Sequence, residues 1–234
     1  PDTDAVALLD KIKAEKQQLI TEGKLKKEKP LPPISSDEVP FSLPDGWVWC
    51  RLGNVCKKIT DGTHHSPINT MKGDYKYITA KNIKNFGIDL SNVTFVTKNI
   101  HEQIFQRCDP EKGDILFVKD GATTGIVTIN NLLEPFSLLS SVALIKPLVL
   151  NKYLMYSMRS PIFYKSVRDS MFGVAITRVT LNKIINAIIP LPPLAEQKAI
   201  VEKVDYLMKQ IEELEAQIKH RKQLAEELMQ TVLR

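Results

Sequence analysis

The sequence has few cysteines and no long apolar run. The three cysteines, Cys50, Cys56 and Cys108, make an odd number and lack the spacing of a metal site. We therefore expect reduced thiols, as in a cytoplasmic protein. The longest apolar run, residues 184–191, contains Asn186 and is far too short to span a membrane.

The chain also lacks the features of a secreted precursor. It begins Pro-Asp-Thr-Asp, without an initiator methionine and without a cationic, apolar leader. We expect a processed or truncated chain rather than a secreted one. Its 234 residues, of which 43% are hydrophobic and 25% charged, predict ordinary globular material. This length allows one large domain, or one domain with a substantial appendage.

Sequence motifs of catalysis and metal binding are missing. There is no Walker A pattern and no Gly-x-Gly-x-x-Gly loop for a nucleotide. Leu-Ala, and not an aromatic residue, follows Pro192-Pro193, so the loop with which an N6-type methyltransferase holds a flipped base is absent. No Cys or Ser lies in a distinctive nucleophile motif. The adjacent His64 and His65 point in different directions without a second Cys/His pair at ligand spacing, so we predict no metal site.

One acidic group leaves a catalytic alternative open. Asp109, Glu111, Lys112 and Asp114 combine carboxylates with a lysine, as metal-dependent nucleases do, although they fit a turn before a strand more naturally. A stand-alone metal-dependent DNA endonuclease is therefore one alternative function. A protein-interaction scaffold that does not bind DNA is another.

Charge is distributed unevenly along the chain. The formal net charge is +5, and residues 146–190, here called the basic block, have seven basic residues against the single acid Asp169. Such a block suits a polyanionic partner. From Glu196 onward, acids and bases nearly balance, which is typical of a solvated helix.

Composition and periodicity predict an α+β fold with four segments. Residues 4–22 have apolar positions at helical spacing, and Gly23 is placed to end that helix. Proline excludes helix from the connector that follows. The four segments are an N-terminal helical segment (1–29), a proline-rich connector (30–42), a mixed α/β domain (43–190) and a C-terminal coiled-coil helix (191–234).

Short β-branched or aromatic pieces bounded by Gly, Asp, Asn or Pro predict the strands of the mixed α/β domain. Helices are expected over residues 99–106 and 151–170. The predicted strands are residues 75–80, 92–97, 114–118, 125–129 and 142–145.

The C-terminal segment predicts one long helix. Pro192-Pro193 marks its start, and apolar residues then recur at alternating spacings of four and three. About forty residues at ~1.5 Å each give a rod of roughly 60 Å, which must project from a domain of ~15 Å radius and pair. We expect residues 4–22 to lie antiparallel along its first half and another chain to cover its outer half. The predicted interface residues are Leu8, Ile12, Leu19, Ile200, Val204, Leu207, Ile211, Leu214, Ile218, Leu228 and Val232.

Four loops carry donors and acceptors suited to base edges: residues 60–67, 81–82, 119–125 and 172–178. Solvated turns favour the same residue types. Four such loops on one basic domain nevertheless favour DNA binding. The predicted DNA-binding residues are Lys57, Asp61, Thr63, His64, His65, Lys81, Asn82, Lys119, Thr123, Thr124, Lys165, Thr177 and Arg178.

Several motifs resemble the specificity subunit of type I restriction-modification enzymes. Residues 43–53, Leu-Pro-Asp-Gly-Trp-Val-Trp-Cys-Arg-Leu-Gly, resemble the start of its target-recognition domain. Residues 113–118, Gly-Asp-Ile-Leu-Phe-Val, resemble an internal strand, and residues 189–197, Ile-Pro-Leu-Pro-Pro-Leu-Ala-Glu-Gln, the start of a long helix. Residues 23–32 resemble the central spacer, so the resemblance covers essentially the whole chain.

The resemblance implies a subunit with two recognition domains, separated by two long antiparallel helices, that each bind half of a split double-stranded DNA target. This chain resembles the C-terminal half of such a subunit, as a fragment or as a natural half-subunit that dimerises. The resemblance implies no catalytic site, metal or cofactor in this chain. S-adenosylmethionine, ATP and Mg²⁺ would belong to modification and restriction subunits in the cytoplasm, with no membrane partner.

Overall fold

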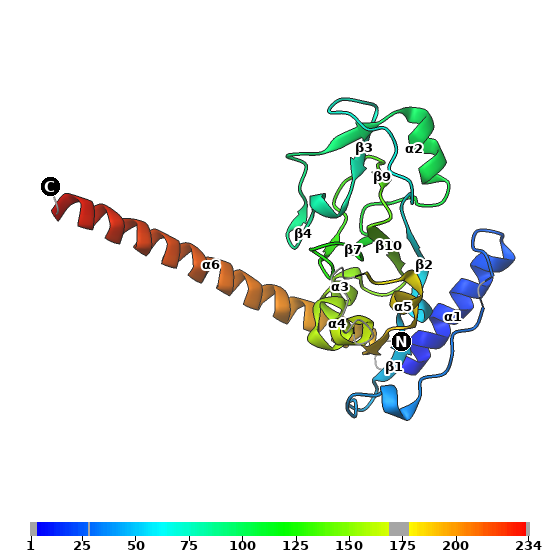
Figure 1. Ribbon diagram of the computed structural model, residues 1–234. Helices are drawn as coiled ribbons and strands as arrows, with labels where there is room; N and C mark the ends of the chain where they lie inside the picture. Colours follow the sequence, from blue (N-terminus) through cyan, green and yellow to red (C-terminus); the bar gives the residue numbers. More distant parts are fainter. Residues whose placement is uncertain (1–3, 28, 169–177, 233–234) are drawn as a thin grey trace.

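The computed structural model describes residues 4–27, 29–168 and 178–232. A mixed α/β domain lies between two helices that leave it on different sides (Figure 1). Helix α1 (Ala5–Thr21) follows the domain surface, whereas the 39-residue helix α6 (Leu194–Val232) projects away from it. The predicted fold class and the projecting C-terminal helix are confirmed.

The largest sheet in the described residues has four antiparallel strands in the order β2-β10-β7-β8. Strand β10 (Val142–Pro147) lies between β2 (Cys56–Asp61) and β7 (Ile115–Val118), and β8 (Val127–Ile129) forms an edge. All four residues of β7 are buried, so this sheet is covered on both faces.

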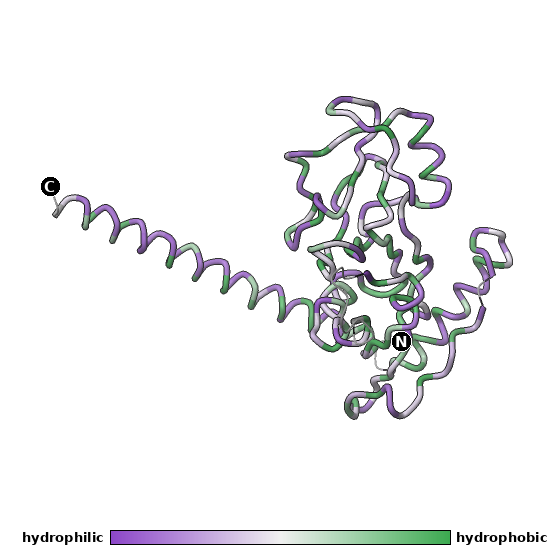
Figure 2. Tube along the Cα trace, in the orientation of Figure 1, coloured by the Kyte–Doolittle hydropathy of each residue, from purple (hydrophilic) through white to green (hydrophobic). Residues whose placement is uncertain are grey.

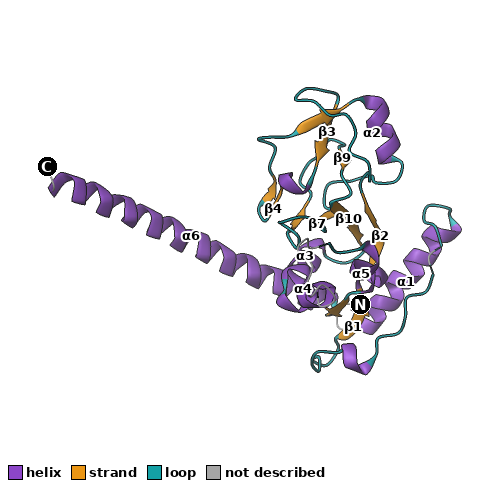
Figure 3. Ribbon diagram, viewed as in Figure 1, coloured by secondary structure: helices purple, strands orange, loops and turns teal. Residues whose placement is uncertain are grey.

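The part of the domain at the top of Figures 1 and 3 contains short strands, loops and the helix α2 (Lys98–Phe105). Strand β3 (Tyr75–Ile78) pairs antiparallel with β6 (Thr94–Val96) and parallel with β9 (Ser137–Leu138). Strands β4 (Ile83–Lys84) and β5 (Gly87–Ile88) form a small hairpin beside them.

A further two-stranded sheet joins the start and the end of the domain. Strand β1 (Val48–Arg51) pairs antiparallel with β11 (Ile188–Leu191). Because β11 ends three residues before α6 begins, this sheet fixes the point at which α6 leaves the domain.

Alternate residues of the central strands face two hydrophobic cores. On β10, Ala143 and Ile145 belong to a core that also contains residues of the helices, here called the helical core. Val142 and Leu144 face the opposite side and belong to the distal core, together with Ile78. The four-stranded sheet therefore separates the two cores.

The predicted helix over residues 151–170 is two helices. Helix α3 (Asn151–Arg159) ends before Ser160, whose backbone is extended, and α4 (Pro161–Arg168) follows. The expectation of one helix was wrong because a residue before proline is disfavoured in the helical region. The other described helices are α2 (Lys98–Phe105) and α5 (Leu181–Asn186), with 3₁₀ turns η1 (Ser36–Glu38), η2 (Leu52–Val55) and η3 (Ala80–Asn82).

Helix α1 has the predicted ends but a different partner. The side chain of Asp4 accepts a hydrogen bond from Val6 N at 2.9 Å, and Gly23 follows the helix with a φ of 69°. Leu8 and Ile12 are 6% and 2% exposed and lie in the helical core. The expected antiparallel pairing with α6 is therefore wrong, because the domain itself buries the apolar face of α1.

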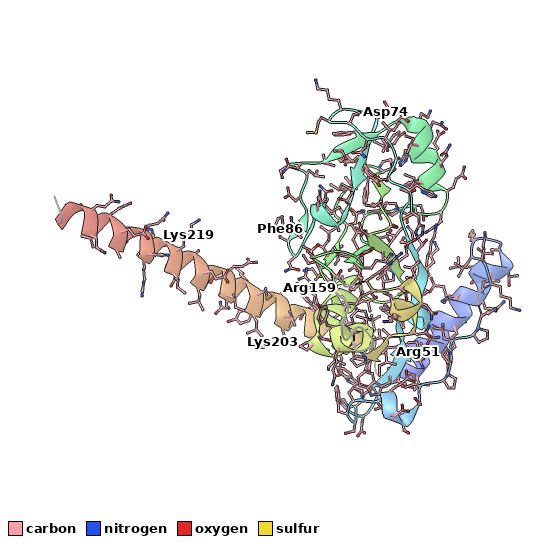
Figure 4. All side chains as sticks on the ribbon, in the orientation of Figure 1. Arg51, Asp74, Phe86, Arg159, Lys203 and Lys219 are labelled. Carbon is pink, nitrogen blue, oxygen red and sulfur yellow. The ribbon has the colours of Figure 1, made fainter. Side chains whose placement is uncertain are left out.

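The first turns of α6 are fixed to the domain. The indole N–H of Trp47 donates to Glu196 at 2.7 Å. The side chain of the fully buried Gln197 accepts a hydrogen bond from Leu150 N at 3.3 Å and donates one to Pro192 O at 3.0 Å. Asp205 accepts hydrogen bonds from Lys152 and Tyr156 at 2.6 and 2.5 Å. Beyond these contacts the helix projects, as the positions of Lys203 and Lys219 in Figure 4 show.

The side chain of Arg51 fastens the proline-rich connector to the domain (Figure 4). Its guanidinium, 6% exposed, donates to the backbone carbonyls of Pro32, Pro33 and Asn186 at 2.7–2.8 Å. Two more hydrogen bonds, at 2.8 and 2.9 Å, go to the carboxylate of Glu38. Hydrogen bonding to Arg51 lowers the pKa of Glu38 from 4.5 to about 2.

All three cysteines are buried, and no disulfide joins them in the described residues. Burial raises the pKa of the Cys50 and Cys108 thiols to about 12, so neither forms a thiolate near neutral pH. A search of the described helices found none that is both long and apolar enough to cross a membrane.

The Glu38–Arg51 contact predicts a pH-dependent stability difference. Glu38→Gln should destabilise the fold at pH 7 by about 1 kcal/mol, a modest loss because the carboxylate is partly exposed and Arg51 keeps its three carbonyl partners. Because the pKa of Glu38 is lower in the folded state, its carboxylate stabilises the fold at pH values above its unfolded pKa. This contribution is lost as the pH falls toward the folded-state pKa. Chemical denaturation should therefore show the difference shrinking from pH 4.5 to about 2.

The matched control is Asp37→Asn on the same 3₁₀ turn. It should leave stability within about 0.5 kcal/mol of wild type at pH 7. Equal losses for the two variants would contradict a specific role for the Arg51 contact.

Candidate nucleic-acid interface

Residues 138–141, a segment absent from the predicted site, bring the predicted loops together. Thr63 N donates to Leu138 O at 2.8 Å, and Ser140 N donates to Thr63 O at 2.9 Å. Gly62 lies so close that a Cβ atom on it would be 1.8 Å from Leu138 O. The loop after β2 therefore runs against the segment that leads from β9 to β10.

Ser141 extends this contact to the other loops. Its hydroxyl accepts a hydrogen bond from Ala80 N at 3.2 Å, and its carbonyl accepts one from Lys119 N at 2.9 Å. Val179 N in turn donates to Lys119 O at 2.7 Å, next to Arg178. We call this surface the loop cluster; it comprises residues 62–66, 79–82, 119–125, 138–141 and 178–179.

Two predicted DNA contacts in the loop cluster are buried and paired instead. Asp61 is 2% exposed, and Lys119 is 2% exposed with its ammonium 3.2 Å from the Asp61 carboxylate. Arg107 from the end of α2 also bonds this carboxylate, and His64 lies 3.3 Å from it. Asp61 and Lys119 therefore hold the loop in place, and neither side chain reaches the exposed surface of the loop cluster.

Asn82 is also a structural residue. Its side chain is buried, accepts from Thr79 N at 3.1 Å and donates to Asp89 O at 3.1 Å. The amide predicted to contact DNA is therefore occupied by the turn η3. The same turn leaves its neighbour Lys81 exposed.

Most of the other predicted DNA-binding side chains in the loop cluster reach the surface. Arg178 is 61% exposed and lies 3.8 Å from Asp120. Thr63 and Thr124 are half-buried, and the hydroxyl of Thr124 donates to Gly121 O at 2.7 Å. Thr177 lies outside the described residues. The exposed members are His64, His65, Lys81, Thr123 and Arg178.

Two predicted contacts lie away from the loop cluster. Lys57 is half-buried at the far end of β2, and Lys165 is exposed on α4, where it lines a hollow with Arg51.

Much of the basic block forms contacts within the protein. Lys146 is buried among carboxylates, and Arg159 donates to the carbonyls of Val127 and Asn85. The block as a whole is therefore not one contact surface.

Several exposed polar side chains beside the loop cluster were not among the predicted DNA-binding residues. Arg107, whose side chain is 51% exposed, lines a groove with His64 and His65. A second hollow of about 560 Å³, here called the polar hollow, lies on the other side of the same loop. Its lining includes Ser66, Asn69, Tyr77, Lys81, Lys84 and Asn92.

The acidic group that suggested a nuclease surrounds a lysine. The ammonium of Lys146 lies 2.8 Å from Glu111, 3.0 Å from Asp114 and 3.7 Å from Asp109. Burial alone would lower the pKa of Lys146, but the hydrogen bonds to Glu111 and Asp114 raise it. No cluster of metal-ligating side chains occurs in the part of the chain that the structure describes. The carboxylates therefore form an ion-pair network at the end of the sheet opposite the loop cluster.

Helix α6 carries a separate apolar stripe. Of the predicted interface residues, Ile200 and Val204 are half-buried near the domain, and Leu19 is half-buried on α1. The side chain of Val232 lies outside the part of the chain that the structure describes. Figure 2 shows hydrophobic positions recurring along the projecting helix. The exposed residues, which we call the α6 stripe, are Leu207, Ile211, Leu214, Ile218 and Leu228, at 46–66% exposure.

A comparison with protein families identifies the chain. Residues 44–221 match the family model for the type I restriction modification DNA specificity domain. The chain belongs to this family. The match spans the loop cluster, the distal core, most of the helical core and the first part of α6.

Curated relatives agree with this assignment. The chain is 32% identical over 256 aligned residues to the type I restriction enzyme EcoAI specificity subunit of Escherichia coli, and covers 40% of that protein. It is 28% identical to the EcoKI specificity subunit of Escherichia coli K12, of which it covers 42%. The chain therefore spans less than half the length of these relatives.

Solved structures share the fold. A chain from a type I R-M system aligns over 90% of this chain and 47% of its own length, with a TM-score of 0.57 and 21% identity. The crystal structure of the HsdS subunit from Thermoanaerobacter tengcongensis aligns over 76% and 46%, with a TM-score of 0.56 and 24% identity. At these identities the similarity concerns the fold alone.

The buried Asp61–Lys119 pair predicts a strong stability effect. Asp61→Asn should destabilise the fold by about 3 kcal/mol, because it leaves the Lys119 ammonium buried without its counter-charge. The double variant Asp61→Asn with Lys119→Met should recover part of this loss. Urea denaturation of both variants measures their free energies of unfolding. A double variant less stable than the sum of the two single effects predicts would contradict the Asp61–Lys119 ion pair.

Proposed function

We propose that this chain recognises a specific DNA sequence, as the specificity part of a type I restriction-modification complex. The observation that carries this proposal is the loop cluster, in which residues 62–66, 79–82 and 119–125 bond to residues 138–141, and Val179 bonds to Lys119. Exposed cations at its surface include Lys81, Arg107 and Arg178. Cations fix a protein on the phosphates, while polar loop side chains read base edges.

We further propose that the chain reads one half of a bipartite target. One loop cluster is present in the described residues, and the chain covers 40% of a relative whose name is specificity subunit. Methyl transfer from S-adenosylmethionine and ATP-dependent restriction would then take place in partner subunits. The match of the chain to a DNA specificity domain supports this division of work.

The α6 stripe is the proposed assembly surface. Its exposed side chains have no counterpart on α1, whose apolar face is used by the helical core. Leaving a large apolar side chain exposed costs about 1.5–3 kcal/mol relative to burial. We propose that a modification subunit, or a second copy of the helices, covers the stripe.

DNA binding through the loop cluster should depend steeply on salt. Each neutralised phosphate contributes about 0.9 to the log–log salt slope on duplex DNA. Arg178→Gln should therefore weaken binding to all duplexes alike and lower the slope by about 1. Titration of the chain with labelled duplex DNA at several salt concentrations measures both quantities.

Lys165→Gln is the matched control, since Lys165 is exposed but lies away from the loop cluster. It should leave the slope unchanged. Salt-independent binding would contradict an electrostatic interface, and no binding at all would favour a scaffold. Cleavage of DNA with Mg²⁺ by the chain alone would favour the nuclease alternative.

Acidic substitutions on the α6 stripe can test whether it is the assembly surface. Ile211→Glu with Ile218→Glu should weaken capture of the modification subunit by more than tenfold, because two buried apolar contacts are worth about 3 kcal/mol or more. The matched control is Gln210→Glu with Gln217→Glu, which adds the same charge one position away from the stripe. Quantitative co-precipitation compares the two, and equal loss in both would contradict the assignment of the stripe.

A further inference from the structure

The polar hollow holds an unusual buried group. The side chain of Tyr77 on β3 is 2% exposed, and its hydroxyl makes no hydrogen bond of ordinary geometry among the described residues. Burial raises the pKa of this phenol, and the nearby hydroxyl of Ser66 lowers it. Buried polar groups are almost always paired, so an unpaired hydroxyl beside a hollow requires a reason.

The polar hollow lies next to the loop cluster. Ala80 and Ser141, joined by a hydrogen bond in the loop cluster, both line the hollow. On its other side are Lys84 of the β4–β5 hairpin and the turn that follows the hairpin. Figure 4 places Phe86, at the tip of this hairpin, on the outer edge of the domain. The hollow therefore opens on the surface that carries the proposed DNA-binding loops.

Donors dominate the rim of the hollow. Lys81 and Asn92 are exposed there, and the amide of Asn92 makes a single long contact of 3.4 Å to Ser91. The one carboxylate in the lining, Asp89, accepts a hydrogen bond from Ser91 N at 2.9 Å. The hollow therefore presents ammonium, amide and phenol donors to whatever enters it.

Purines match this set of donors. In the major groove both purines offer the N7 acceptor beside a second polar group, O6 in guanine or the N6 amino group in adenine. Asparagine pairs with adenine through N6 and N7, and lysine pairs with guanine through O6 and N7. Pyrimidines have no acceptor that corresponds to N7.

We propose that the polar hollow reads the major-groove edge of one purine in the target, with Asn92 and Lys81 at its rim and the Tyr77 hydroxyl at its floor. This inference rests on the proposed DNA-binding function and deepens it. It assigns base discrimination to Asn92, in place of the structurally occupied Asn82. It also gives the unpaired Tyr77 hydroxyl its partner when DNA is bound.

The test uses the specificity subunit assembled with its modification subunits and a randomised duplex DNA library. Retained duplexes are sequenced for wild type, Tyr77→Phe and Asn92→Ala. Both variants should relax the preference at the same purine position, by about tenfold for Asn92→Ala, and leave other positions unchanged. Asn99→Ala, an exposed asparagine on α2 outside the hollow, is the matched control and should change no position.

Thermal denaturation provides a second measurement. Because the Tyr77 hydroxyl is unpaired in the fold, Tyr77→Phe should keep or raise the melting temperature. A lower melting temperature would mean that the fold already satisfies the hydroxyl, and would overturn its assignment.

A chemical substitution in the DNA then tests the purine itself. Replacing the affected purine by its 7-deaza analogue should weaken wild-type binding and add little to the loss in Asn92→Ala. Unchanged preferences in both variants, or changes at unrelated positions, would overturn the assignment of the hollow. If the wild-type complex retains no sequence above background, the proposed function fails instead, so the two failures are distinguishable.

Discussion

The close approach of Gly62 to the carbonyl of Leu138 determines how the recognition surface is built. A Cβ atom on Gly62 would lie 1.8 Å from Leu138 O, so only glycine allows the two backbones to meet there. The hydrogen bonds of Thr63 and Ser141 then add the remaining loops. The loops are therefore held by main-chain and buried contacts, and their exposed side chains are left to interact with a ligand.

The parts of the fold that the sequence pattern predicted are those with a local signal. Helices α1 and α6 repeat apolar residues over many turns, and the strand β10 begins with the apolar run Val-Ala-Leu-Ile. The strands β4, β5 and β9 have two residues each, too few to show an alternating pattern, and β9 forms only through its distant partner β3. An apolar stripe also does not indicate which surface covers it. For this reason the sequence pattern predicted α6, and not the domain, as the packing partner of α1.

The candidate site was predictable as a set of loops but not residue by residue. Residue type alone cannot distinguish Asp61, Lys119 and Asn82, which are buried and bonded, from exposed residues such as Lys81. Arg107 and Asn92 were overlooked because one follows a helix and the other lay in a predicted strand. Their exposure depends on how distant segments pack, which a single sequence does not record.

The four-stranded sheet between the two cores separates substitutions on the loop side from substitutions on the side of the helices. Val142 and Leu144 support the loop side, whereas Ala143 and Ile145 support the side to which α1 and α6 are attached. The buried sheet thus lies between the attachment of the helices and any substitution in the distal core or in a loop packed on it. Changes in the loops that pack on the distal core can therefore be accommodated without disturbing the packing that attaches α1 and α6.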